Sequence, residues 1–272
     1  RAFEWGDLLT MTAIETRLLA RGEPVIIDDY FDMLRAPGGP EKFKSEVLND
    51  PARDMLGEAQ LSFVADTLGA SKRAGKPWRL IANQVVMGKV MTPDMTPHVD
   101  EASLAAIEAV WDGVREFVEV SKYGLPVYPD SWDGYPAARE KLYARLKGEG
   151  VTDMFVITGD AHEFWGNDLI DDAGDKMGIE IGTTSVSSET LATFMGDNTA
   201  AYALLMTQSN PDVRYYNAMH NGYTDIEFGR DRAAVKMMAI DSVVSQEYGA
   251  FEAAAFTVRP THTSLKLTSP KG

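Results

Sequence analysis

The chain has 272 residues, of which 44% are hydrophobic and 25% charged, and its formal net charge at pH 7 is −15. These values are typical of a globular protein with an ample core, and the negative charge argues against nucleic acid or an anionic membrane as a partner, because both would be repelled. The absence of cysteine excludes disulfides, thiolate ligands and a cysteine nucleophile, and no run approaches the roughly 18 apolar residues of a membrane helix.

The residues before position 90 are predicted to form two strands, a long loop and a helix. A strand is expected over residues 11–17, with Arg17 at its end, and a Pro-, Gly- and Asp-rich excursion with one short helix over residues 22–52. From Glu58 onward, apolar residues recur at the spacing of one helix face. Residues 78–87 are expected to form a second buried strand, which two amide side chains interrupt.

The middle of the chain is predicted to alternate loops and helices before a third strand. Residues 91–99 form a proline-broken loop, followed by a helix of about 20 residues through Val118. Residues 126–136 form a loop rich in aromatic and turn-forming residues. A basic helix over residues 137–147 then leads to a buried strand over residues 154–157.

The last third of the chain is predicted to be mainly strands. A short helix is expected after residue 188, and three strand-like runs follow at residues 222–228, 233–240 and 253–258, each bounded by turn residues. No internal repeat interrupts this order. Residues 1–272 are therefore expected to form a single domain of mixed α/β class.

The most informative motif is Gly159-Asp160-Ala161-His162, which directly follows the third buried strand. A carboxylate and an imidazole two residues apart can bind the same hard or borderline metal ion. The carboxyl ends of strands are also where α/β folds place their ligands. Asp160 and His162 are therefore the candidate metal ligands, although a Gly-Asp turn can also serve only to cap the next segment.

Further motifs run through the chain in fixed order. The most specific are Trp132-Asp133-Gly134-Tyr135 and Gly159-Asp160-Ala161-His162. The others are Phe3-Glu4-Trp5-Gly6-Asp7-Leu8, Glu15-Thr16-Arg17, Leu56-Gly57-Glu58-Ala59-Gln60, Asn83-Gln84-Val85-Val86-Met87, Ser185-Val186-Ser187-Ser188, Asn210-Pro211 and Gly222-Tyr223-Thr224. Together they resemble the PhoD-like (alkaline phosphatase D) metallophosphatase family over essentially the entire chain.

The resemblance implies a calcineurin-like metallophosphatase fold, in which two mixed β-sheets pack together between outer helices. It also implies a dinuclear metal site at the strand ends, where two metals hold phosphate oxygens and activate a water for attack at phosphorus. Family members are associated with iron and calcium, and zinc or manganese are alternatives. The implied partner is a small phosphate ester, and the implied location is periplasmic or secreted.

The same resemblance shows what the sequence lacks. The family's first metal motifs, a Gly-Asp-x-x-Tyr turn and an Asp-Asp-His-Glu turn, are absent, so the chain resembles the second half of the domain. A dinuclear site cannot be built from Asp160 and His162 alone. Half of a sheet sandwich would expose an apolar sheet face, so we expect a second polypeptide, a homodimer or an incomplete sequence.

Four further side chains are candidates for the site, each with a structural alternative. Asn83 is predicted to face the metals or the phosphate, or else to be a satisfied buried amide. Arg17 is predicted to bind a phosphate oxygen, or else to neutralise an acidic side chain. Trp132 is predicted to form a wall of the cleft while Asp133 orients a metal ligand; alternatively, both belong to a packed loop. Either His162 or water protonates the leaving group.

Three functions are compatible with these motifs. The preferred one is metal-dependent hydrolysis of phosphate esters, as a phosphomonoesterase or phosphodiesterase, with this chain supplying half of the site. The alternative is a non-catalytic remnant that serves as a binding or assembly module. A serine hydrolase based on Ser185, Ser187 or Ser188 is disfavoured, because no Ser-His-Asp order or nucleophile elbow supports it.

Overall fold

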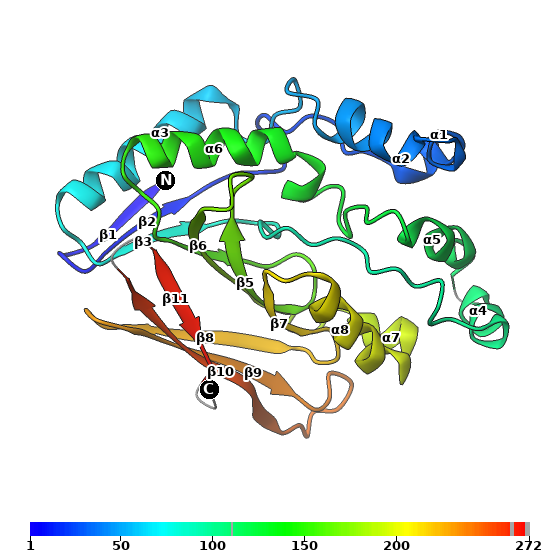
Figure 1. The fold of residues 1–272 in the computed structure, drawn as a ribbon. Helices are drawn as coiled ribbons and strands as arrows, with labels where there is room; N and C mark the ends of the chain where they lie inside the picture. The colour runs from blue at the N-terminus through cyan, green and yellow to red at the C-terminus, as the bar shows by residue number, and fades with distance from the viewer. Residues whose placement is uncertain (110, 262–263, 270–272) are drawn as a thin grey trace.

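Two β-sheets pack face to face, and helices cover the outer face of the larger one (Figure 1). The computed structural model describes residues 1–109, 111–261 and 264–269. The larger sheet has the strand order β1-β2-β3-β4-β6-β5-β7, and the smaller sheet has the order β11-β10-β9-β8.

The strands of the larger sheet are β1 (Ala2–Trp5), β2 (Leu9–Ala13), β3 (Trp78–Ala82), β4 (Met154–Thr158), β5 (Phe164–Ile170), β6 (Lys176–Gly182) and β7 (Val213–Asn217). Those of the smaller sheet are β8 (Gly222–Phe228), β9 (Ala233–Ile240), β10 (Ala250–Pro260) and β11 (Leu265–Thr268). The helices are α1 (Phe31–Arg35), α2 (Gly39–Lys42), α3 (Gly57–Arg73), α4 (Glu101–Glu108), α5 (Val114–Ser121), α6 (Pro136–Gly148), α7 (Leu191–Met195) and α8 (Asn198–Ser209).

The larger sheet is mixed, as predicted, but the smaller one is antiparallel throughout. Strands β2, β3, β4 and β6 are parallel neighbours, and β1, β5 and β7 run antiparallel to their partners. In the smaller sheet every pairing is antiparallel. Short connections join these four strands, and a short connection can only join antiparallel neighbours. The prediction of two mixed sheets is therefore wrong for the second sheet.

The inner face of the larger sheet is covered within this chain. Trp78, Phe155 and Phe228 meet edge to face between the two sheets, with ring centroids 5.1 to 6.3 Å apart. Val235 and Met237 of β9 are buried in the same core. The prediction that an apolar sheet face would be left exposed is wrong, because β8 to β11 supply the second layer.

The outer face of the smaller sheet carries no described helix in Figure 1, in contrast to the predicted arrangement of two sheets between helices. Strand β8, at one edge of this sheet, has a largely polar outer face. Its alternate residues Tyr223, Asp225 and Glu227 are exposed, while the intervening residues are buried or half-buried. Two of the three outward side chains are carboxylates, so this strand does not present an apolar face that a helix must cover.

On the opposite side of the molecule, α3 and α6 lie across the larger sheet (Figure 1). Leu61, Val64 and Leu68 of α3 are buried there, as their spacing predicts. The predictions for α6, β4, β8 and β9 are also confirmed. Within the described residues, no helix combines the length and apolarity needed to cross a bilayer.

Two predicted strands end earlier than expected, and both stop at polar side chains that bind the backbone. Strand β2 ends at Ala13, because the Glu15 carboxylate accepts from backbone N–H groups that follow it. Strand β3 ends at Ala82, because Asn83 Oδ1 accepts from the backbone N–H of Gln84. Side chains of this kind offer the backbone an alternative to the sheet ladder.

Other parts of the sequence were predicted less well. The single helix expected through Val118 is two helices, since α4 ends at Glu108 and α5 begins at Val114. The region 22–52 was expected to contain one short helix. It contains α1 and α2, a 3₁₀-helix at residues 27–30 and a π-helix at residues 43–48. Strands β1, β5, β6, β7 and β11 were not predicted.

Candidate functional site

Polar side chains gather where the parallel strands of the larger sheet end. Arg17 follows β2, Asn83 follows β3, Asp160 and His162 follow β4, and Thr183 follows β6. Because these four strands are parallel neighbours, their carboxyl ends lie along one edge of the sheet. Open α/β sheets bind ligands at this edge. We call Arg17, Asn83, Asp130, Asp160 and His162 the strand-end site.

Arg17 links two carboxylates across the strand-end site. Its Nη1 lies 2.6 Å from Asp130 Oδ2, and its Nη2 donates to Asp160 Oδ2. Burial acts to lower the pKa of Arg17, but the two carboxylates outweigh it and the net shift is upward. Arg17 therefore neutralises acidic side chains in this structure, which was the alternative to phosphate binding.

The Glu15 carboxylate fixes the turn that carries Arg17. It accepts from the backbone N–H of Arg17 at 2.6 Å, of Leu18 at 2.9 Å and of Leu19 at 2.8 Å. Partial desolvation opposes its ionisation, but these donors win, so the pKa of Glu15 lies below its usual range. These hydrogen bonds therefore hold the backbone of Arg17 in one conformation, which positions its guanidinium group.

Asp160 and His162 have left-handed backbone conformations, with φ of 71° and 58°. Within residues 1–109, 111–261 and 264–269 they are the non-glycine residues with positive φ. Such a conformation costs free energy for a residue with a Cβ atom, and strained residues of this kind gather at functional sites. The turn after β4 thus presents both candidate ligands in an unfavourable backbone geometry.

The hydrogen bond of His162 determines which ring nitrogen is free. Nδ1 lies 2.8 Å from the backbone carbonyl oxygen of Glu189. A carbonyl can only accept, so Nδ1 carries a proton, and in the neutral imidazole the lone pair lies on Nε2. Metal-binding histidines are oriented in the same way, with one nitrogen donating to a carbonyl and the other facing the metal. Thr184 Oγ1 also donates to the His162 backbone carbonyl at 2.8 Å.

Asn83 is buried, and its amide is already hydrogen-bonded. Its Nδ2 donates to the carbonyl of Val85, and its Oδ1 accepts from the backbone N–H of Gln84 at 3.0 Å and from Trp132 Nε1 at 3.4 Å. Gln84 Oε1 in turn accepts from Thr16 N at 2.6 Å. Asn83 therefore lies in a network that ties the ends of β2 and β3 together.

Trp132 and Asp133 lie behind the site rather than on its surface. Trp132 is fully buried between the larger sheet and α6, and it reaches the site through Asn83. Asp133 is also buried and pairs with Arg139 at 2.6 Å, while its second oxygen accepts from Val90 N at 2.8 Å. Burial raises the pKa of Asp133, and Arg139 opposes that shift.

Asn83 also lines a cavity of about 390 Å³ between the ends of the two sheets. Its other walls include Thr183 and Thr184 after β6, and Tyr223 and Thr224 of β8. The two sheets are joined here by a hydrogen bond of 3.1 Å from Thr224 Oγ1 to Thr183 Oγ1. No role was predicted for these residues, although Thr183 directly follows β6, the parallel neighbour of β4.

Asp130 and Glu163 are two further polar residues that the sequence analysis did not single out. Asp130 belongs to the quoted aromatic loop, and its pairing with Arg17 spans 113 residues of sequence. Glu163 is 2% exposed and accepts from the hydroxyls of Tyr128 and Tyr216, each at 2.7 Å. Burial raises the pKa of Glu163 to about 7.

The strand-end site offers an incomplete set of metal ligands. Within the described residues no three His, Cys, Asp or Glu side chains are grouped so that they could hold a metal ion. Asp160 and the free Nε2 of His162 suit a metal chemically, but they are two ligands. They fit part of one coordination sphere, and the described residues do not build the predicted dinuclear site.

Ser185 makes hydrogen bonds of a structural kind. Its Oγ donates to the Ser188 carbonyl at 2.7 Å and accepts from Asn221 Nδ2 at 2.7 Å. In the described part of the chain no imidazole is hydrogen-bonded to it. The serine-hydrolase reading gains no support from this geometry.

Comparison with known proteins identifies the family. The model of the PhoD-like phosphatases matches residues 1–237. This chain belongs to the PhoD-like phosphatase family. It is 24% identical over 224 residues to alkaline phosphatase D of Bacillus subtilis (strain 168), which covers 82% of this chain and 31% of that protein.

The fold agrees with that assignment. A solved structure described as "Structure of PhoD" superposes with a TM-score of 0.64 at 20% identity, covering 99% of this chain and 43% of the other. The chain therefore spans about a third of the curated relative and less than half of the solved one. The family resemblance read from the sequence is confirmed.

Proposed function

We propose that this chain supplies part of the active site of a metal-dependent phosphate-ester hydrolase of the PhoD-like type, acting as a phosphomonoesterase or phosphodiesterase. Asp160 and His162 are the proposed metal ligands. The observation that carries the proposal is their shared turn after β4, where both backbones are left-handed and His162 makes its hydrogen bond through Nδ1, which leaves Nε2 for a metal. The metals are iron and calcium by family resemblance, with zinc or manganese as alternatives.

A bound metal would supply Lewis acidity and lower the pKa of a coordinated water. The residues of the chain have separate tasks in this scheme. Asp160 and His162 would hold the metal, and Arg17 would keep its contact with Asp130 through Nη1. Arg17 Nη2, which donates to Asp160 in this structure, would then be available to a phosphate oxygen, so the two predicted roles of Arg17 are compatible.

Asn83 and the residues behind it have a positioning task. The Asn83 amide lies on the wall of the cavity at the strand ends, and Trp132 Nε1 holds its oxygen. Asp133 keeps the loop before α6 in place through Arg139 and Val90. These contacts support the proposed site from the core side without reaching the metal ligands.

The remaining metal ligands come from outside the described residues in this scheme. A second polypeptide or a second copy of the chain are two sources for them, and a longer protein that includes this segment is a third. We propose that residues 1–272 act as one domain and that the location is periplasmic or secreted, as in the family. A small phosphate ester is the proposed substrate.

A non-catalytic binding or assembly module is the second candidate. It is favoured by one observation, that the described residues do not group three acidic or imidazole side chains around a metal. This candidate predicts no hydrolysis under any metal condition, so one assay separates the two proposals.

That assay measures hydrolysis of p-nitrophenyl phosphate and bis-p-nitrophenyl phosphate by the full protein, with iron, calcium, zinc or manganese added. We expect metal-dependent turnover that falls by roughly 100-fold in His162→Ala. The matched control is His98→Ala, which removes an exposed histidine from a loop. No turnover with any metal would favour the binding module, and equal loss in both variants would remove His162 from the site.

A further inference from the structure

A separate cavity of about 370 Å³ lies among the short helices that follow the loop at residues 91–99. Helices α4, α5, α7 and α8 all contribute to its wall. Most of the lining side chains are aliphatic or aromatic, including Val114, Phe117 and Met195. We call this space the helical cavity. Its lining shares no residue with the cavity at the strand ends.

A single charged side chain, Glu163, lies in the described wall of the helical cavity. The carboxylate is held by the hydroxyls of Tyr128 and Tyr216, each at 2.7 Å. Within the described residues no lysine, arginine or histidine forms an ion pair or hydrogen bond with it. Burying a carboxylate without a counter-charge is unfavourable, so an incoming cation would gain from this position.

Tyr202 provides a second polar group in the same wall. It is 5% exposed, and its hydroxyl makes no hydrogen bond within the described part of the chain. The Glu163 carboxylate is close enough to influence it electrostatically. The hydroxyl oxygen is not one of the fully buried atoms of the described chain, so a molecule in the cavity can reach it. Tyr202 can accept a hydrogen bond from a ligand that also reaches Glu163.

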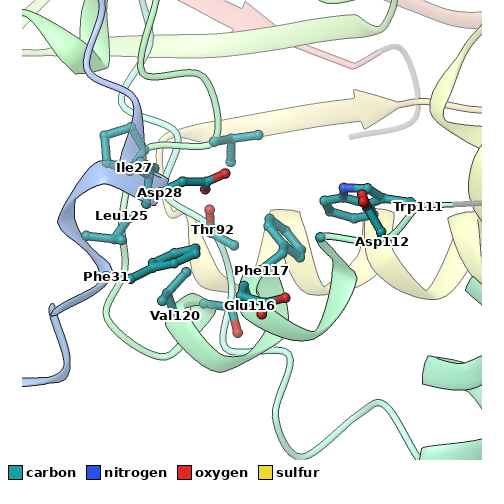
Figure 2. A pocket seen from close by; sticks show the side chains of 14 residues that line it. Ile27, Asp28, Phe31, Thr92, Trp111, Asp112, Glu116, Phe117, Val120 and Leu125 are labelled. Carbon is teal, nitrogen blue, oxygen red and sulfur yellow. The ribbon is translucent and has the colours of Figure 1, made fainter. Parts of the chain in front are cut away.

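The neighbouring surface is acidic. An open cavity of about 570 Å³ shares Trp111, Phe117 and Val127 with the helical cavity and carries Asp28 and Glu116 on its wall (Figure 2). Among its described lining residues there is no lysine, arginine or histidine. Carboxylates around an opening of this kind attract cations and repel anions.

We propose that the helical cavity binds an organic cation with an apolar body, such as an alkylamine. The ammonium group is placed between the Glu163 carboxylate and the Tyr202 hydroxyl. The rings of Phe117 and Tyr128 add attraction for a cation, since an ammonium group is drawn to the face of an aromatic ring. The aliphatic wall takes the apolar body, as in other small-molecule sites with few polar groups. This site is distinct from the proposed hydrolytic one.

Calorimetric titration of the full protein with hexylammonium, hexan-1-ol and hexanoate tests this proposal. The three probes share an alkyl chain and differ in charge. We expect hexylammonium to bind roughly tenfold or more tightly than hexan-1-ol, and hexanoate to show no binding. Equal affinity for hexylammonium and hexan-1-ol, or no binding of hexylammonium, would overturn the proposal.

Three variants test whether the ammonium group binds beside Glu163. Glu163→Gln keeps the size of the side chain, and we expect it to remove the preference for hexylammonium over hexan-1-ol. The matched control Glu116→Gln, which lies in the neighbouring open cavity, should retain that preference. Val99→Trp fills the helical cavity from a half-exposed loop position and should abolish binding of both probes. Unchanged binding of hexylammonium by Glu163→Gln would contradict the assignment.

A melting curve of each variant shows whether it folds. If Glu163→Gln does not fold, Tyr202→Phe provides a second test of the site. This variant removes one hydroxyl and keeps the ring. We expect hexylammonium affinity to fall several-fold while hexan-1-ol loses less, because the primary ammonium can donate to both polar groups. If Glu163→Gln does not fold, unchanged hexylammonium affinity in both Tyr202→Phe and Val99→Trp overturns the proposal.

Discussion

The strand-end site and the helical cavity are neighbours in sequence, because His162 belongs to the first and Glu163 to the second. They differ in whether their carboxylates are paired with cations. At the strand ends, Arg17 pairs with Asp130 and Asp160, and the buried Asp133 behind them pairs with Arg139. Glu163, the next residue after His162, is buried and accepts hydrogen bonds from two tyrosine hydroxyls. No cation of the described chain pairs with it. The same turn therefore connects a region in which each carboxylate has a cationic partner to one that lacks a cationic partner.

The difference agrees with the two different ligands proposed above for these regions. In the proposed scheme, the paired charges at the strand ends would exchange partners for a metal and a phosphate. A carboxylate without a counter-ion instead favours a ligand that brings its own positive charge. The comparison predicts that charge removal should have opposite effects on stability in the two regions.

The largest effect is expected from breaking the buried pair behind the strand-end site. Arg139→Met leaves Asp133 buried without its cation, and we expect a loss of about 3–5 kcal/mol in the free energy of unfolding. Urea denaturation measures it. The double variant Arg139→Met with Asp133→Leu removes both charges and should recover much of the loss. A single variant as stable as the wild type would show that the pair contributes little.

Glu163→Gln should have the opposite sign, and its effect should depend on pH. Burial raises the pKa of Glu163 from 4.5 to about 7, so the folded state holds more protons than the unfolded state between these values. The contribution of Glu163 to the free energy of unfolding is therefore fully present below pH 4.5. It is lost as the pH rises through 7, by about 3 kcal/mol in all.

The measurement compares urea denaturation of the wild type and Glu163→Gln at pH 5 and pH 8. Glutamine cannot ionise, so the variant should lack this part of the pH dependence and gain on the wild type at pH 8. Glu101→Gln serves as the control, because that exposed carboxylate pairs with Arg115 at 2.7 Å and the pairing lowers its pKa. Parallel pH profiles for the wild type and Glu163→Gln would show that the carboxylate is compensated.

A smaller loss is expected at the turn that carries Arg17. Glu15→Ala removes the acceptor of three backbone N–H groups on a partly exposed turn, which should lower the free energy of unfolding by about 1–2 kcal/mol. Metal-dependent hydrolysis should fall by more than the loss of folded protein explains, because the backbone that positions Arg17 is no longer held in place. Equal hydrolysis by Glu15→Ala and wild type at saturating metal would separate the turn from the proposed site.

The sequence predicted those parts of the fold that depend on local spacing. Helix α3 follows from the apolar positions Leu61, Val64 and Leu68, and β8 and β9 follow from turn residues at both ends. The position of Asp160 at a strand end was also predictable, because β4 is a short apolar run directly before it. Each of these features is determined by residues close in sequence.

Contacts between distant segments were not predictable in the same way. Glu163 is held by Tyr128 and Tyr216, which lie 35 and 53 residues away. The pairing of Arg17 with Asp160 spans 143 residues. One sequence contains no pattern that matches a particular tyrosine or arginine to a distant carboxylate, so only the fold reveals these partners.

The state of the His162 ring is the most direct test of the proposed site. Long-range ¹H–¹⁵N NMR spectra, assigned with His162→Gln, report which ring nitrogen carries the proton. We predict a proton on Nδ1, set by the Glu189 carbonyl, and a large shift of Nε2 when Zn²⁺ is added to the full protein. A proton on Nε2, or a ring signal that Zn²⁺ does not change, would contradict the assignment of His162 as a metal ligand.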